Sequence, residues 1–188
     1  MPLFHAAWHA IFHVTSMLTG TGLVFADYSS WGALPIGIFF FVMITGGCAG
    51  STTGGVKIFR LYVLFASARS QIFRLLISHR IHVPQFNRKP IGEAIAESVM
   101  GYFFIYMLSV SLFAMALGAA GFDLTSALSG AAAALSNVGV AMGGKLGPFD
   151  NLADQTATAK WILAAAMVFG RVEMLAFLVL FVPAFWEG

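Results

Sequence analysis

The sequence predicts an all-α integral membrane protein made of helix–pore-helix–helix repeats with re-entrant pore loops, and three observations support this fold class. Hydrophobic residues fill 59% of the 188 positions and charged residues only 10%, with a mean hydropathy of +0.86, whereas roughly a quarter of a soluble domain is charged. The basic residues gather in one region. Two apolar helices too short to cross a bilayer each end in a glycine-containing polar turn. A chain this apolar could not cover a water-facing surface, which excludes a soluble enzyme, a nucleic-acid-binding protein and a disordered chain.

The first predicted element is a helix over residues 3–18. At about 1.5 Å per residue it is only about 24 Å long, too short for a comfortable span. The turn Thr19-Gly20-Thr21-Gly22 follows it. Residues 31–66 are apolar again, but as one helix they would measure about 54 Å, far more than the thickness of the bilayer core. Because glycines crowd positions 46–55, we expect two helical pieces around a glycine-rich break.

A basic region follows the second piece. No Asp or Glu occurs between Asp27 and Glu93, and seven of the ten basic residues fall within positions 57–89: Lys57, Arg60, Arg69, Arg74, Arg80, Arg88 and Lys89. A Lys/Arg excess beside membrane spans marks the cytoplasmic side. We therefore expect residues 67–92 to be a cytoplasmic linker in a multi-pass protein of the cell (inner) membrane.

The last part of the chain repeats the order of the first. Residues 98–122 carry no charge and form a full span, and Asp123 is a plausible N-cap for a short alanine-rich helix over 124–135. This helix ends in Ser136-Asn137-Val138-Gly139 and a glycine-rich loop. The final predicted span, 161–183, contains Arg171 and Glu173. A charge near the middle of a span is costly, so Arg171 should face a cavity or the bundle interior and have a partner.

An internal repeat emerges when residues 15–23 are superposed on 132–140, which places Gly22 on Gly139. In both, a helix too short to span is followed by small or hydroxyl residues, glycine, a polar loop and an apolar helix. Backbone carbonyls of such a turn can replace the hydration shell of an alkali cation, glycine allows them to turn inward, and the short helix aims its negative C-terminal end at the ion. The alternative is a tight turn between helices. The candidate potassium-binding residues are Thr19, Gly20, Thr21, Gly22, Ser136, Asn137, Val138 and Gly139.

Three motifs together resemble one family. The stretch Gly-Gly-Cys-Ala-Gly-Ser-Thr-Thr-Gly-Gly-Val-Lys at 46–57, Ser-Asn-Val-Gly at 136–139 and Phe-Gly-Arg-Val-Glu at 169–173 resemble the TrkH/KtrB/HKT superfamily of potassium transporters. The resemblance implies four repeats around one pore, of which residues 1–66 would be the remnant of the third and 93–188 the fourth. It implies potassium as the transported ion with no cofactor, a homodimer, and a cytosolic nucleotide-binding regulatory subunit.

The resemblance also assigns roles to residues. Residues 46–57, here called the gate loop, would interrupt a pore-lining helix below the filter and act as a gate. Arg171 would lie near the pore, as a barrier to cations or a partner of the gate loop; a structural ion pair is the alternative. The gate residues are Gly46, Gly47, Gly50, Ser51, Thr52, Gly54, Gly55 and Lys57. A packing kink is the simpler explanation of this break, and a phosphate loop fits poorly because Val56 precedes the lysine and an apolar helix precedes the loop.

Two rival functions remain. His5, His9 and His13 recur every four residues along one helix face, which suits a divalent-metal transporter, although packing and hydrogen bonding are the more ordinary roles. An intramembrane hydrolase would use Ser51 as nucleophile, but the nearest histidines in sequence, His79 and His82, belong to the basic linker. Since no catalytic acid–base set is visible, we expect a protein that is not an enzyme. Asp27 and Asp150 follow the two turns and would either concentrate cations or serve as ordinary loop acids.

Overall fold

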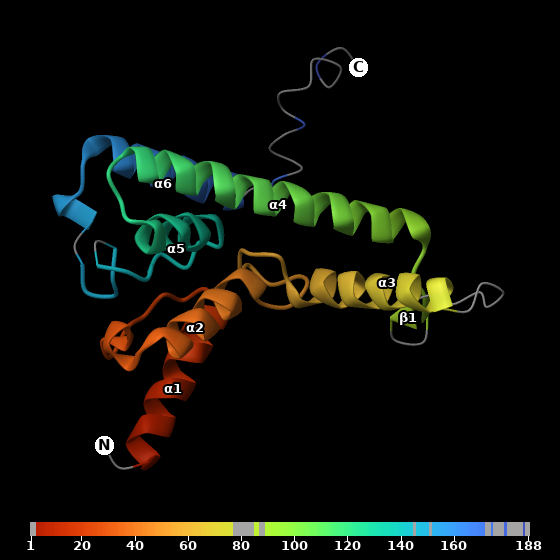
Figure 1. The fold of residues 1–188 in the computed structure, drawn as a ribbon, viewed down its shortest axis with the longest axis horizontal. Coiled ribbons are helices and arrows are strands. Elements are labelled where there is room, and N and C mark those ends of the chain that lie inside the picture. The colour runs from red at the N-terminus through yellow and green to blue at the C-terminus, as the bar shows by residue number, and fades with distance from the viewer. Residues whose placement is uncertain are drawn as a thin grey trace.

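The computed structural model describes residues 3–76, 85–86, 89–144, 146–150, 152–171, 174, 179 and 186. The regular elements of these residues are helices apart from two short antiparallel strands (Figure 1), and loops connect them. In chain order the elements are α1 (Leu3–Leu18), η1 (Tyr28–Trp31), α2 (Ala33–Thr45), α3 (Ile58–Leu76), β1 (Gln85–Phe86), β2 (Lys89–Pro90), α4 (Glu93–Ala119), α5 (Leu124–Leu135), η2 (Leu152–Asp154) and α6 (Ala157–Arg171).

The helix α4 contacts three other helices, α3, α5 and α6. Among the described residues it is the one helix both long and apolar enough to cross a membrane, with 27 residues and a mean hydropathy of 1.9 over its most apolar stretch. Figure 1 shows α6 running beside it and α3 following its other half, and both pairs are in contact. The shorter helices α2 and α5 are apolar but fall below the length of a span.

The short helix α5 is enclosed by its neighbours. Nine of its twelve residues are buried, and it packs against α4, α6 and α2. Alanines dominate it because small side chains let these helices approach closely. Its start is fixed as expected: the Asp123 carboxylate accepts a hydrogen bond from the Ser126 N–H at 3.1 Å, satisfying one of the donors that a helix N-terminus leaves free.

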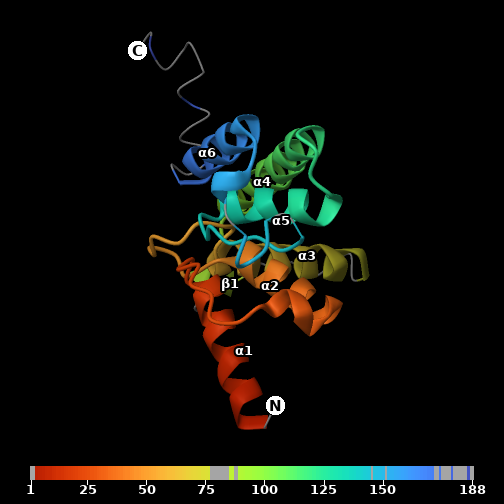
Figure 2. The ribbon, with the colours of Figure 1, turned by 90° about the vertical axis from the view of Figure 1, so that its left-hand side faces the viewer.

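The first half of the chain forms a second group of helices. α1 packs against α2, and α2 against α5, while α1 projects away from the other helices (Figure 2). As expected, the apolar stretch divides into α2 and α3 around a non-helical segment at 46–57.

Two boundaries differ from the expected ones. α3 continues to Leu76, so the first positions of the 67–92 region are helical. No glycine or proline interrupts this stretch before Pro84, and arginine, glutamine and alanine are good helix formers. α6 begins at Ala157, four positions before the expected start of the last span. Glu173, the region 180–183, and the loop residues His79, Arg80, His82, Pro84 and Arg88 lie outside the described residues.

Candidate functional site

The two glycine-containing turns end α1 and α5 with the same backbone hydrogen bonds. In each, three consecutive N–H groups donate to carbonyls four, three and five residues earlier, and the last two bonds define a Schellman motif. In the first turn (19–22) the donors are Thr19, Gly20 and Thr21 and the acceptors Thr15, Met17 and Ser16. In the second turn (136–139) the donors are Ser136, Asn137 and Val138 and the acceptors Ala132, Ala134 and Ala133. Donors and acceptors coincide when 15–23 is superposed on 132–140, which confirms the predicted repeat.

The backbone dihedral angles repeat as well. Gly20 and Asn137 have φ of +68° and +55°, and Gly22 and Gly139 have φ of +71° and +83°. Asparagine is one of the few residues with a side chain that adopts this left-handed conformation routinely. The Asn137 amide nitrogen also donates to the Met167 carbonyl at 3.2 Å, which ties the second turn to α6.

The two turns lie against each other. A Cβ at Gly22 would collide with the carbonyl oxygen of Val138, so only glycine allows the two backbones to come this close. The structure therefore brings together two predicted filter segments that are more than a hundred residues apart in sequence.

The gate loop is a non-helical segment whose two ends are joined by hydrogen bonds, and so it is more than a simple helix kink. The N–H groups of Val56 and Lys57 donate to the Ile44 and Thr45 carbonyls, each at 2.9 Å, and the Ile58 N–H donates to the Gly47 carbonyl at 3.1 Å. These bonds join the start of α3 back to the end of α2. The two ends of the loop are thus held next to each other.

The gate loop packs against both turns. A Cβ at Gly54 would collide with the Ser136 carbonyl, and one at Gly20 would lie 3.7 Å from the methyl group of Thr53. Gly54 does not have a positive φ, so close approach to the second turn is what requires glycine there.

Two tyrosines on α4 reach these two features. The Tyr106 and Ser136 hydroxyls form a hydrogen bond of 2.9 Å, and the Tyr102 hydroxyl donates to the Gly55 carbonyl at 3.3 Å. Both tyrosines are buried, and the Arg60 guanidinium lies 3.8 Å from the centre of the Tyr102 ring. The two tyrosines are missing from the sequence-based candidates, although two hydroxyl-bearing rings four positions apart in an uncharged span are a usable signal.

Arg171 contacts the gate loop. Its Nη1 donates to the Thr52 carbonyl at 2.6 Å, and both residues line a cavity of about 220 Å³ together with Lys57, Tyr102 and Gly170. Gly170 is needed because a Cβ there would collide with the Leu135 carbonyl at the end of α5. The last described turn of α6 thus lies between α5 and the gate loop.

The N-terminal histidines are not gathered into a ligand set. Both ring nitrogens of the fully buried His13 are engaged, Nδ1 with the His9 carbonyl at 2.7 Å and Nε2 with the Phe25 and Ala26 N–H groups, each at 3.3 Å. Among the described residues no three His, Cys, Asp or Glu side chains come close enough to hold a metal. The structure thus shows His13 in packing and hydrogen bonding.

The remaining polar candidates make local bonds. The Ser51 hydroxyl accepts the Thr53 N–H at 3.3 Å, as a turn residue does. Asp27 accepts the Ser29 N–H at 2.9 Å and Asp150 the Gly147 N–H at 2.6 Å, so both acids cap their own loops.

The residue after Asp27 connects the two halves. The fully buried Tyr28 donates its hydroxyl to the Ala141 carbonyl, just beyond the second turn, at 3.0 Å. Burial, and then the charge of Asp27, raise the pKa of Tyr28, so the hydroxyl keeps the proton that it donates.

The chain thus contains two short helices whose matched turns are in backbone contact, with a glycine-rich loop packed against both turns. The sequence matches the family described as "TrkH: Cation transport protein" over residues 1–187. The chain belongs to this family of membrane transporters, which are not enzymes.

Similar proteins are potassium uptake proteins. The "Trk system potassium uptake protein TrkI" of Halomonas elongata is 40% identical over 99% of this chain, and the "Trk system potassium uptake protein TrkH" of Escherichia coli K12 is 36% identical over 95% of it. The crystal structure of the potassium transporter TrkH from Vibrio parahaemolyticus superposes on 95% of the chain with a TM-score of 0.85 and 31% identity. This chain spans 36–38% of the length of these proteins.

Proposed function

We propose that the protein containing this chain takes up potassium across the cell membrane through a carbonyl-lined filter, of which the turns 19–22 and 136–139 form two segments. The observation that carries the proposal is the matched geometry of the two turns, which end two short helices with the same bonds and meet at Gly22 and Val138. The relatives' potassium uptake and the 36–40% identity support it.

The turns act as re-entrant pore loops in this proposal. Non-helical backbone at membrane depth is tolerated where it is buried in protein or lines a water-filled path, and the carbonyls of all eight turn residues are candidates to replace potassium's hydration shell. The C-terminal ends of α1 and α5 carry partial negative charge and stabilise a cation in front of them.

The gate loop closes the path below the filter. Its contacts with both turns, and the bond from Arg171 to the Thr52 carbonyl, support this role. Opening then requires the loop to leave the turns and Arg171 to release it. The arginine's positive charge adds an electrostatic barrier while the loop is closed.

The wider assembly follows the family resemblance. We propose residues 1–66 as part of a third repeat, 67–92 as a cytoplasmic linker and 93–188 as a fourth repeat, in a homodimer within the cell (inner) membrane. A cytosolic nucleotide-binding subunit would regulate the gate. The basic residues of α3, among them Arg69, support the cytoplasmic placement of the linker.

The test is rubidium-tracer uptake into proteoliposomes that hold the intact gene product, competed with potassium and then with sodium. We expect potassium to block uptake and sodium to block it weakly, and Gly139→Ser to impair uptake because serine at φ +83° strains the turn. His9→Ala should leave uptake intact. Loss of uptake in His9→Ala with normal uptake in Gly139→Ser would instead support the divalent-metal alternative.

A further inference from the structure

The backbone just beyond each turn is held by a polar side chain from the helix before it. In the first half, His13 Nε2 faces the N–H groups of Phe25 and Ala26. Because an N–H can only donate, Nε2 must be the acceptor, and the proton of a neutral ring is on Nδ1, where it is donated to the His9 carbonyl.

In the second half of the chain, the Ser129 side chain holds the backbone in the same way. Its hydroxyl accepts the Met142 N–H at 3.0 Å and donates to the Met142 carbonyl, and both residues are almost fully buried. Phe25 and Met142 occupy the same position when 15–23 is superposed on 132–140 and the superposition is extended. One backbone position is therefore held in both repeats, although by different residue types.

When the two helices are superposed, His13 and Ser129 lie one position apart, and the packing around Gly130 explains this offset. Gly130 is the position equivalent to His13, and a Cβ there would lie 2.8 Å from the Leu146 side chain. Leu146 takes the space that the imidazole fills in the first half, where His13 packs at 5.4 Å from Trp31 and 5.7 Å from Tyr28, measured between ring centres. In the second half of the chain, the residue before Gly130, Ser129, forms the hydrogen bonds to the backbone instead.

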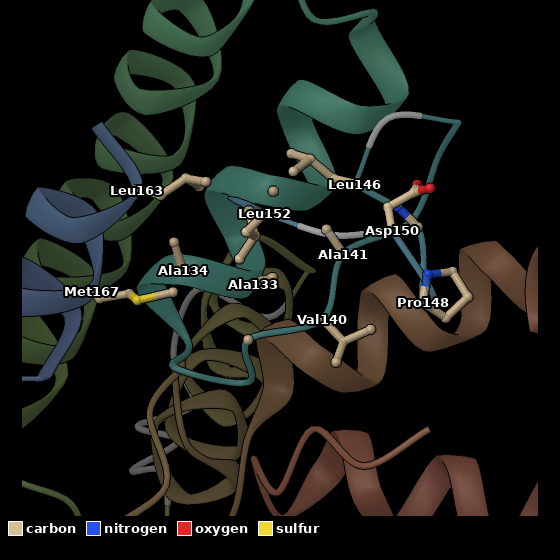
Figure 3. A pocket seen from close by; sticks show the side chains of 13 residues that line it. Ala133, Ala134, Val140, Ala141, Leu146, Pro148, Asp150, Leu152, Leu163 and Met167 are labelled. Carbon is tan, nitrogen blue, oxygen red and sulfur yellow. The ribbon is translucent and has the colours of Figure 1, made fainter. Parts of the chain in front are cut away.

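Packing alone does not fix the outer backbone of the second turn. A cavity of about 80 Å³ lies behind it, lined by α5, α6 and the loop, with Gly139, Val140 and Ala141 on its wall (Figure 3). The bonds from Tyr28 to Ala141 and from Ser129 to Met142 are what hold this segment beside the open space.

We propose that His13 and Ser129 are positioning residues for ion discrimination, each fixing the outer backbone of one filter turn so that its carbonyls keep their spacing. This inference rests on the proposed function, since it concerns the same filter. Neither residue touches the transported ion; each acts through the backbone that it holds.

The test measures the ratio of rubidium to sodium tracer uptake by the intact gene product in proteoliposomes, a ratio that does not depend on how much protein inserts. His13→Phe keeps an aromatic ring among Trp31 and Tyr28 but removes the acceptor, and Ser129→Ala removes only the hydroxyl. We expect each to lower the ratio at least about five- to tenfold, the effect of a single hydrogen bond, because each variant loses more than one. His13→Gln, whose amide oxygen reaches near the position of Nε2, should restore most of the ratio.

Matched controls change the same residue types elsewhere. His5→Phe alters an exposed histidine of α1, and Ser111→Ala removes a hydroxyl that bonds within α4; both should keep the wild-type ratio. An unchanged ratio in His13→Phe and Ser129→Ala, or equal ratios for His13→Gln and His13→Phe, would overturn the inference while leaving potassium uptake standing. If His13→Phe fails to insert into the membrane, the uptake ratio of Ser129→Ala alone tests the inference. A wild-type protein without rubidium uptake would overturn the proposed function itself.

Discussion

At the scale of single residues, the equivalent glycines Gly22 and Gly139 have different surroundings. Both have positive φ, so a side chain at either strains the backbone by about 1–2 kcal/mol. Only Gly22 also faces a backbone oxygen, that of Val138, while a Cβ at Gly139 meets nothing within 4 Å. The repeat is therefore symmetric in conformation and asymmetric in packing.

This asymmetry predicts unequal effects of the same substitution. Gly139→Ala should reduce rubidium uptake by about five- to thirtyfold through strain alone, whereas Gly22→Ala must also separate the two turns and should abolish potassium-selective uptake. Tracer uptake by both variants of the intact protein, beside Gly118→Ala in a helix with open space around it, checks the order. Equal uptake in the two turn variants would show that the contact between the turns is not needed for transport.

At the scale of elements, the sequence predicted what local pattern encodes. Short apolar runs followed by glycine fixed the ends of α1 and α5, and the crowd of glycines at 46–55 placed the break. The contacts of Tyr28, Tyr102 and Ser129 could not be foreseen, because each joins residues that only the tertiary fold brings together. α3 is longer than predicted for another reason: a cluster of positive charge predicts a polar loop, but such residues are equally compatible with a helix.

The helix α4 contacts the gate loop through Tyr102 and the second turn through Tyr106, and if these are the proposed gate and filter, the effects of the two tyrosines should separate. Tyr102→Phe removes the bond to the Gly55 carbonyl and should raise uptake under conditions that keep the gate closed, by about fivefold for one hydrogen bond, without changing ion preference. Tyr106→Phe removes the bond to Ser136 and should lower the ratio of rubidium to sodium uptake without opening the gate.

Both tyrosine variants are measured in proteoliposomes of the intact protein, for basal flux and for ion preference. Tyr62→Phe, which changes an exposed tyrosine of α3, is the control. The assignment fails if the two variants alter the same quantity, since filter and gate would then not be held separately by this helix.

At the scale of the whole molecule, the described chain carries two matched helix–turn units and one glycine-rich loop that packs against both turns. The pairing of the two turns is visible in the sequence as a repeat, and their matched hydrogen bonds agree with that pairing. The relatives are nearly three times as long as this chain. A carbonyl cage needs ligands on all sides of the ion, and two adjacent turns supply only part of one.

Residues 1–188 alone should therefore fail to conduct. We expect proteoliposomes holding only this chain to show no rubidium uptake above empty vesicles, and uptake to appear when the rest of the gene product is co-expressed and reconstituted with it.

The surface of the chain also indicates missing neighbours. Many large apolar side chains are exposed on α1, α3 and α4, and such a surface is typical of an interface or of lipid contact. Among them are Phe4, Trp8, Phe65 and Phe104. Potassium-selective uptake by the chain alone would mean that copies of it assemble into a complete filter, and crosslinking at the unique Cys48 would then test for neighbouring copies as covalent dimers.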